Sequence, residues 1–234
     1  MKRGQIEAVW RETAQCQDCG IRDLVLFADL KEPDFRLIHL PIEEIDFDAG
    51  QVLYSAGDDG QALYTLRAGL IKLVQYLPDG TQRIVRLLKR GATAGLEVTL
   101  GQPYEHTAVA LQRTSVCRIP RQVVDRLSRE TPRLHGQLMQ RWHEALHQAD
   151  DWLTELSTGK APQRLARLLI HLAEPDGTVT LLSREDLGAM LGITTEHASR
   201  TVAELKRQGA IVELSPNRCR CAIDQLQCIG AANC

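Results

Sequence analysis

Residues 182–209 read LSREDLGAMLGITTEHASRTVAELKRQG, and this stretch predicts two short helices joined by a tight turn. Ser183 is the expected cap of the first helix, and Asp186, three residues later, completes a capping box. Apolar residues follow at helical spacing up to Gly192, which supplies the turn. The stretch therefore predicts a helix-turn-helix.

The second helix of this motif begins with polar side chains that point outward. Thr194 or Thr195 caps it, and apolar residues at helical spacing hold its other face inward. In DNA-binding proteins the first turns of such a helix enter the major groove, where Glu accepts from cytosine, Arg binds guanine and Ser reaches either base. The candidate contacts to double-stranded DNA are Thr195, Glu196, His197, Ser199 and Arg200. The alternative is an ordinary helical hairpin with a solvated polar face.

The flanking residues extend this motif to a winged helix. Residues 162–173 place four leucines on one face behind an early proline, as a supporting helix does. After the second helix, residues 210–214 and 218–223 read as two short strands around a Ser-Pro-Asn turn.

Farther upstream, apolar residues recur at spacings of three and four, which is typical of a coiled-coil seam. They are Leu134, Leu138, Trp142, Ala145, Ala149, Trp152 and Leu156. The pattern predicts a homodimer whose two reading helices lie about one DNA turn apart, as a palindromic site requires. Packing of the same stripe against the chain's own sensor domain is the alternative, and the two are compatible.

Residues 24–120 hold short alternating runs separated by turn signals, the pattern of an antiparallel β-roll of the jelly-roll type. The expected fold class is α+β, with this roll, a long dimerisation helix and a C-terminal winged helix-turn-helix. The expected domains are a cysteine-containing N-terminal segment (1–23), the β-roll sensor (24–120), the dimerisation helix (121–157) and the DNA-binding domain with its cysteine-rich tail (158–234).

Length and charge set limits on this interpretation. The chain has 234 residues, enough for two domains, and a net charge of -2. From residue 160 onward, 9 Lys and Arg stand against 8 Asp and Glu, so DNA binding depends on a locally basic face and on dimerisation. The sequence has no long apolar run and no signal-peptide core, so we expect a cytoplasmic protein without a membrane partner.

The order of elements, with ALYTLRAGLIKL in the roll and TTEHASR in the reading helix, resembles the CRP/FNR family of bacterial transcription regulators over nearly the whole chain. The reading helix is similar to that of the FNR branch. The resemblance implies that Glu196 and Arg200 address the G·C pair of a TTGAT-type half-site, and that Ser199 addresses a neighbouring T. It also implies a homodimer without a catalytic site, which contacts RNA polymerase if it activates transcription.

The effector positions of the family are altered in this chain. Members that bind cyclic nucleotides hold the ribose with a Glu and the cyclic phosphate with an Arg-Ser pair, where this sequence has Leu96, His106 and Thr107. Glu97 is displaced by one residue. A buried phosphate without its arginine loses a charge-assisted partner, so we do not expect cAMP binding.

The cysteines indicate a redox or gas signal instead. Oxygen-sensing FNR proteins hold an iron–sulfur cluster with an N-terminal Cys-x-x-Cys, a third Cys six residues later and a Cys before Ile-Pro. Cys16, Cys19 and Cys117 resemble three of these ligands, and position 25 is Val. The resemblance therefore implies a cluster with an unassigned fourth ligand. Its candidates are Asp18, Asp23, Asp29 and a C-terminal cysteine.

Two other sensing mechanisms stay open beside the cluster. One is a thiol–disulfide switch formed by Cys16 and Cys19, or by one of them with Cys117. The other is a regulator with an unidentified small-molecule effector.

The remaining metal-ligand residues form no recognised motif. The C-terminal cysteines match no zinc-site spacing, and the first two alternate along a predicted strand. They are Cys219, Cys221, Cys228 and Cys234. His39 and His106 are isolated on the roll, which disfavours both a haem site and a cupin-like metal enzyme.

Overall fold

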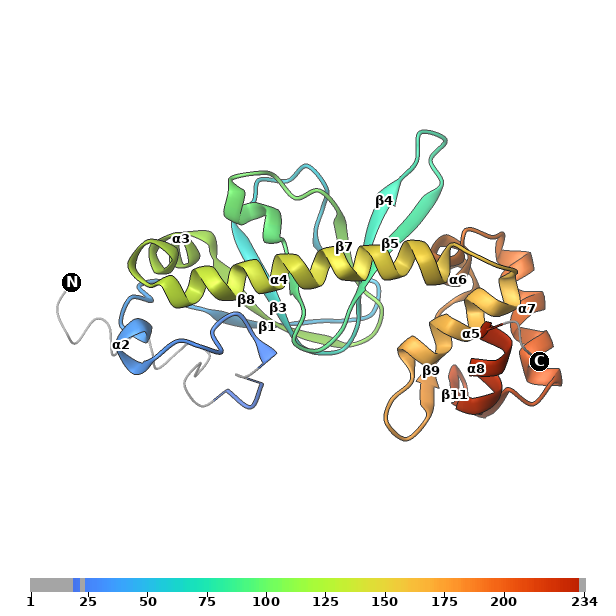
Figure 1. Ribbon diagram of the computed structural model, residues 1–234. Helices are drawn as coiled ribbons and strands as arrows, with labels where there is room; N and C mark the ends of the chain where they lie inside the picture. Colours follow the sequence, from blue (N-terminus) through green and yellow to red (C-terminus); the bar gives the residue numbers. More distant parts are fainter. Residues whose placement is uncertain (1–18, 22–23, 232–234) are drawn as a thin grey trace. The chain divides into compact units, whose positions relative to one another are not determined.

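The computed structural model describes residues 19–21 and 24–231 of the chain. These residues form two compact units. The first contains the described residues up to Gln75 together with Arg86–His147, and the second contains Tyr76–Val85 and the described residues from Gln148 onward. Figure 1 labels most of their helices and strands.

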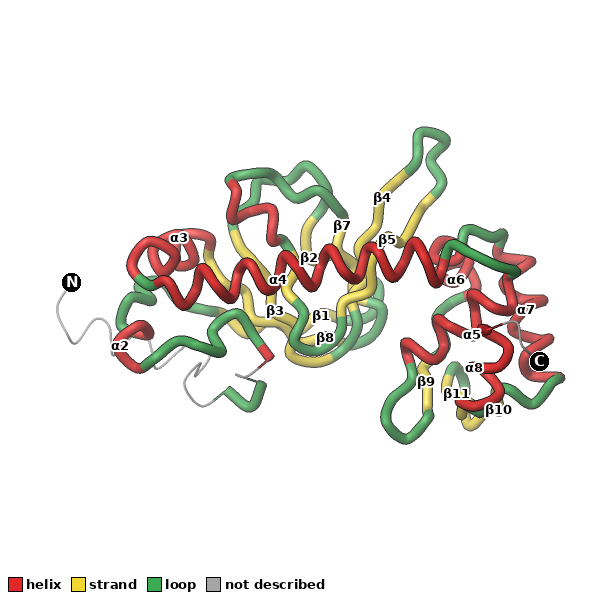
Figure 2. Tube along the Cα trace, in the orientation of Figure 1, coloured by secondary structure: helices red, strands yellow, loops and turns green. Residues whose placement is uncertain are grey.

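The first unit is built on two antiparallel four-stranded sheets, drawn in yellow in Figure 2. One sheet has the order β1-β8-β3-β6 and the other has the order β2-β7-β4-β5. The strands are β1 (Glu43–Phe47), β2 (Val52–Tyr54), β3 (Ala62–Ala68), β4 (Ile71–Tyr76), β5 (Gln82–Leu88), β6 (Thr93–Ala94), β7 (Thr107–Ala110) and β8 (Thr114–Pro120). The predicted β-roll is confirmed, and its core is filled by large apolar side chains such as Leu63, Leu66 and Leu87.

Helical segments complete this unit. They are α2 (Glu32–Phe35), the 3₁₀ helix η2 (Leu96–Leu100), α3 (Arg121–Glu130) and α4 (Pro132–Asp151) as far as His147. The last turn of α4 belongs to the second unit and continues into the π-helical turn η3 (Trp152–Leu156). The single helix predicted over 121–157 is therefore divided. Thr131 is extended, with φ of -139° and ψ of 122°, because a residue before proline avoids the helical region. Pro132 then opens α4, where its missing N–H costs no hydrogen bond.

An ion pair attaches α2 to α4. The Arg133 guanidinium donates to both carboxylate oxygens of the buried Asp34, at 2.9 and 2.8 Å. Burial alone would raise the pKa of Asp34, but the Lys31 N–H and Arg133 outweigh it, and the pKa lies below its usual value. Helix α2 is thereby fixed to the N-terminal end of α4.

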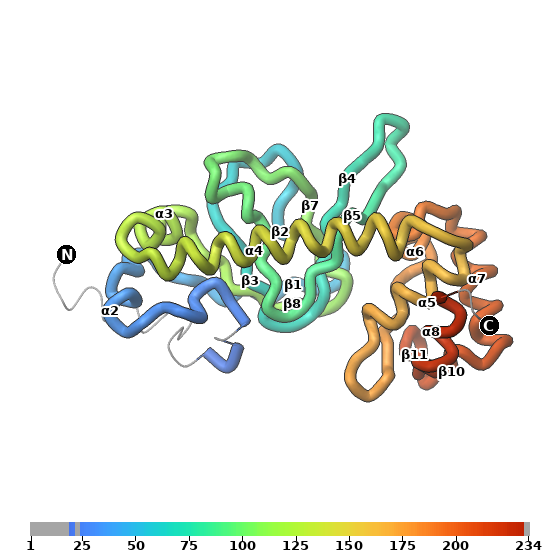
Figure 3. The backbone as a smooth tube through the Cα atoms, in the orientation of Figure 1, coloured from blue at the N-terminus to red at the C-terminus, as the bar shows by residue number. Residues whose placement is uncertain are grey.

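The second unit is a winged helix-turn-helix, and Figure 3 follows its chain to the red C-terminal helix α8. Its elements are α5 (Ala161–Leu172), β9 (Thr178–Thr180), α6 (Arg184–Leu191), α7 (Thr195–Arg207), β10 (Ile211–Ser215), β11 (Arg218–Cys221) and α8 (Ile223–Ala231). The two predicted wing strands pair in a sheet of order β10-β11-β9. Strand β9 and helix α8 were not predicted. No helix among the described residues is both long and apolar enough to cross a membrane.

Candidate functional site

Side-chain caps fix both helices of the predicted motif. The Ser183 hydroxyl accepts the Asp186 N–H at 3.0 Å and donates to the Asp186 carboxylate at 2.7 Å. Thr194, rather than Thr195, caps α7, where its hydroxyl accepts the His197 N–H at 3.2 Å. Gly192 forms the turn with a φ of 66°, a conformation that glycine adopts without strain. The predicted helices, their caps and the turn are thus confirmed, and the Asp186 carboxylate binds the Ser183 hydroxyl, where a capping box uses the N-cap N–H.

Gly188 sets the distance between α6 and the turn. A Cβ atom at this position would lie 2.7 Å from the Ile193 carbonyl oxygen and 3.4 Å from the Thr195 nitrogen. Both neighbours are backbone atoms, so neither can move aside without changing the motif. The need for a residue without a Cβ atom at position 188 was not predicted from the sequence, where the only signal is a glycine inside a short helix.

Replacing Gly188 with Ala is expected to destabilise the second unit by about 1–3 kcal/mol, because the added methyl group overpacks the turn. Urea unfolding followed by circular dichroism measures this change. The matched control is Gly136→Ala in α4, where an added Cβ meets no atom within 4 Å. That variant should gain about 0.5–1 kcal/mol from helix propensity. Equal effects of the two substitutions would contradict the close contact.

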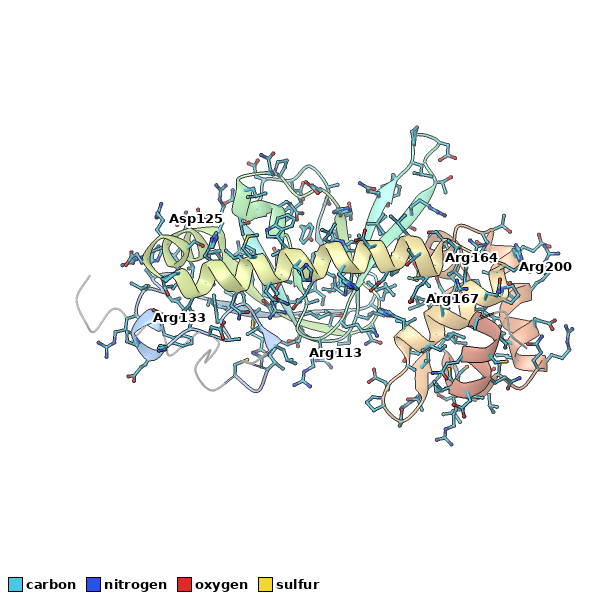
Figure 4. All side chains as sticks on the ribbon, viewed as in Figure 1. Arg113, Asp125, Arg133, Arg164, Arg167 and Arg200 are labelled. Carbon is cyan, nitrogen blue, oxygen red and sulfur yellow. The ribbon has the colours of Figure 1, made fainter. Side chains whose placement is uncertain are left out.

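The outer face of α7 carries all five predicted reading residues. Ala198, Val202 and Leu205 are buried on the inner face. The residues exposed on the first turns are Thr195, Glu196, His197, Ser199 and Arg200. Glu196 and Arg200 lie one turn apart, and their side chains form an ion pair at 3.5 Å. Figure 4 shows Arg200 at the surface of the unit, so its guanidinium is accessible to a ligand.

Two arginines on α5, labelled in Figure 4, connect α5 to neighbouring elements of this unit through hydrogen bonds. The Arg164 side chain donates to the carbonyl oxygen of Leu191, at the end of α6. Arg167 donates to the Gly230 carbonyl at 2.7 and 2.9 Å, and to the Glu155 carbonyl at 2.8 Å. One guanidinium thus joins α5, α8 and the segment after α4. The sequence shows these residues only as polar positions on a leucine-rich helix, so their role was missed.

A second group of side chains lies on the first sheet around Cys117. This residue is 8% exposed on β8, and its direct cross-strand neighbours are Glu44 on β1 and Thr65 on β3. Arg67 donates through Nη1 to the Cys117 sulfur at 3.6 Å and to the Cys19 sulfur at 3.8 Å. Its Nε pairs with Glu44 at 3.1 Å. The structure therefore brings Cys19 and Cys117 to the same guanidinium nitrogen.

The charge state of this group follows from burial. Burial raises the pKa of the Cys117 thiol above its ordinary value, although Arg67 opposes the shift. Cys117 is consequently a protonated thiol near neutral pH. A thiol of this kind reacts slowly with oxidants, because the thiolate is the reactive species. A bound metal would remove the proton, since coordinated thiols are deprotonated.

Among the described residues, no other predicted ligand is joined to this pair. Cys16, Asp18 and Asp23 lie outside the described residues. Asp29 is exposed and accepts a hydrogen bond from the Gln137 side chain. In the described ranges, no three His, Cys, Asp or Glu residues come together in a group that could hold a metal ion.

Both units of the chain match known family models. Residues 44–131 match the cyclic nucleotide-binding domain, and residues 163–227 match the Crp-like helix-turn-helix domain. The chain is 29% identical over 201 residues to the fumarate and nitrate reduction regulatory protein of Vibrio cholerae. The matched residues cover 82% of this chain and 80% of that protein. The protein of the same name from Escherichia coli K12 is 29% identical over 205 residues, covering 84% and 82%. The chain belongs to the CRP/FNR family of transcription regulators.

Solved structures of CRP/FNR regulators share this fold. FixK2 from Bradyrhizobium japonicum superposes with a TM-score of 0.74 at 23% identity, over 81% of this chain and 98% of that chain. A CRP-family transcriptional regulator from Thermus thermophilus gives a TM-score of 0.70 at 23% identity, over 80% and 96%. The helix-turn-helix makes this chain a DNA-binding protein, and the family is not enzymatic.

The roll of this CRP/FNR regulator has polar groups in its interior that the sequence did not reveal. Glu97 is buried, and its carboxylate accepts the Glu105 N–H at 3.1 Å. The Tyr54 hydroxyl and His106 Nδ1 are also buried, without a hydrogen-bond partner among the described residues. Burial raises the pKa of Tyr54 and lowers that of His106, so both side chains are neutral. Leu96, at the expected ribose-binding position, is buried and apolar.

Cys219 and Cys221 pack in the interior of the second unit, whereas Cys228 takes part in a disulfide bond. Cys219 and Cys221 are buried side by side on one face of β11, as their spacing predicts. Burial raises the pKa of both thiols, that of Cys221 to about 11. His39, a haem candidate, shares a hydrogen bond with the Leu37 carbonyl. Cys234 lies outside the described residues.

Helix α4 of this CRP/FNR regulator has two apolar faces instead of the predicted one. Leu134, Leu138 and Leu156 are buried within the protomer. The other predicted seam residues, Trp142, Ala145, Ala149 and Trp152, are half-buried. Met139, Leu146 and Leu153, which are seven residues apart, are 57%, 62% and 65% exposed. The buried leucines thus pack within the protomer, as the alternative interpretation of the stripe predicts.

Proposed function

We propose that the protein is a homodimeric regulator that binds a TTGAT-type palindrome through α7 and changes its DNA affinity in response to a redox or gas signal. The exposed Glu196–Arg200 pair carries the DNA-binding part of this proposal. A bidentate arginine recognises guanine, and a carboxylate one turn away accepts from the paired cytosine. Ser199, exposed between them, is the candidate contact to a neighbouring T.

The dimer seam that we propose follows the exposed face of α4. Starting at Met139 and ending at Leu153, apolar residues alternate at spacings of three and four. They are Met139, Trp142, Leu146, Ala149 and Leu153. Two such helices side by side would bury side chains that are exposed in the protomer. The seam is rotated from the predicted stripe, with which it shares Trp142 and Ala149.

For the sensor we propose an iron–sulfur cluster held by Cys16, Cys19 and Cys117. The convergence of two thiols on Arg67 supports this assignment, because hydrogen bonds and positive charge next to the sulfurs tune such clusters. The raised pKa of the buried Cys117 thiol slows its reaction with oxidants, and a bound metal would still remove its proton. The curated relatives are named for fumarate and nitrate reduction, which fits an anaerobic signal. The fourth ligand is not assigned by the described residues.

Replacing Arg200 with Ala tests the reading function. We expect a loss of about 1–3 kcal/mol on a TTGAT palindrome and little change on random DNA, because a base contact carries sequence information. Gel-shift titrations on both sequences at one salt concentration measure the difference.

The matched control is Arg207→Ala, which removes a comparably exposed arginine from the last turn of the same helix. This variant should weaken binding to both DNA sequences by a similar small factor. Equal losses on specific and random DNA for Arg200→Ala would mean that Arg200 contacts only phosphate.

A further inference from the structure

Helix α4 carries two histidines one turn apart in the sequence His-Glu-Ala-Leu-His, residues 143–147. His143 and His147 are both exposed. Their ring centroids lie 6.2 Å apart, with an angle of 71° between the ring planes. Side chains four residues apart lie one above the other on a helix, so both imidazoles can reach one ion.

This pair lies on the side of α4 that faces away from the first unit's core. At 100° per residue, Leu138, Arg141 and Ala145 point in the opposite direction, and all three are buried or half-buried. The exposed seam through Leu146 runs along a third direction, beside the histidines. The pair therefore lies beside the seam and not on it.

We propose that His143 and His147 bind one divalent transition-metal ion per chain, of the kind that prefers imidazole nitrogen, such as Zn²⁺. Two ligands come from the protein, and water completes the coordination, because the described residues supply no third ligand at this place. Each pair lies on a single helix, so the site needs no second chain. Chelation across one turn also stabilises the helical form of α4, since only that form aligns both rings.

The glutamate between the histidines does not make this a hydrolytic centre. In zinc peptidases with the same His-Glu-x-x-His spacing, the glutamate is the general base. Here one Glu144 oxygen accepts from Arg141 at 2.8 Å and the other accepts from Gln140 at 3.1 Å. Both oxygens are thus engaged by side chains of the preceding turn. The site therefore binds metal without acting as a catalyst.

Isothermal titration of the full chain with Zn²⁺ tests this proposal. The wild type should bind one more Zn²⁺ per chain than His143→Gln or His147→Gln. Zinc bound by cysteines appears equally in all variants, so the difference reports the histidine pair alone. The matched control is His135→Gln, an exposed histidine on the same helix, which should keep the wild-type stoichiometry. Mg²⁺, which prefers oxygen ligands, should not distinguish the variants.

Thermal unfolding provides a second measurement. Zn²⁺ should raise the Tm of the wild type more than that of His147→Gln, because binding to the folded state adds to stability. Identical stoichiometry and identical Tm shifts in the wild type and His147→Gln would overturn the proposal. Loss of the site in His135→Gln would overturn the assignment to this pair.

Discussion

Leu146→Glu is expected to convert the protein to a monomer and to abolish specific binding to a full palindrome. The side chain lies at the middle of the exposed seam, so the substitution would place two carboxylates in an apolar interface. A monomer contacts one half-site only, and its affinity should fall at least about a thousandfold, the lower end of the usual gap between specific and non-specific binding. Light scattering gives the mass, and gel shifts give the affinity.

Leu100→Glu is the matched control for this experiment. Leu100 lies on η2 and is 67% exposed, so the same change of charge takes place at an exposed leucine outside the proposed seam. This variant should keep the mass and DNA affinity of the wild type. A dimeric Leu146→Glu protein would place the interface elsewhere.

The second large effect is expected for Cys117→Ala. If this thiol ligates a cluster, protein purified without oxygen should be brown, and the variant should lose its iron and sulfide, with affinity for the cluster reduced at least about tenfold. Visible absorption and iron and sulfide analysis measure the loss.

Cys221→Ala is the matched control, because Cys221 is also a buried strand thiol whose pKa is raised by burial. It should keep the cluster and lose only packing. Colourless wild-type protein after anaerobic reconstitution with iron and sulfide would refute the cluster. A reversible disulfide that includes Cys19, detected by mass spectrometry, would then favour the thiol switch.

Local signals were sufficient to predict the helix-turn-helix. A capping serine, a turn glycine and apolar positions at helical spacing all lie within 28 residues, 182–209. Interactions of this range depend little on the rest of the chain, so α6, α7 and the wing strands appear where the pattern places them. The close approach at Gly188 was not visible, because it involves a backbone atom whose position only the folded turn defines.

Long-range arrangement was harder to predict. The position of Arg67 between Cys19 and Cys117 depends on strand pairing across 50 residues, and no local spacing indicates it. The division of the predicted long helix at Pro132 was visible in principle, since the residue before a proline avoids the helical region. The face of α4 that forms a dimer seam could not be chosen from the sequence, because apolar residues cover two faces and periodicity alone does not tell which face the protomer buries.

Trp142 belongs to both apolar faces of α4. This overlap couples ligand binding within one chain to the association of two chains. In the proposed dimer the same half-buried ring contributes to packing inside the protomer and to the contact between protomers. Any ligand or oxidation that changes how firmly the ring is held within one chain must change the association constant of two chains. Association must change the affinity for that ligand by the same factor. The ligand concentration at which a sensor built on this helix responds therefore depends on the protein concentration. The expression level of the protein would then set that ligand concentration.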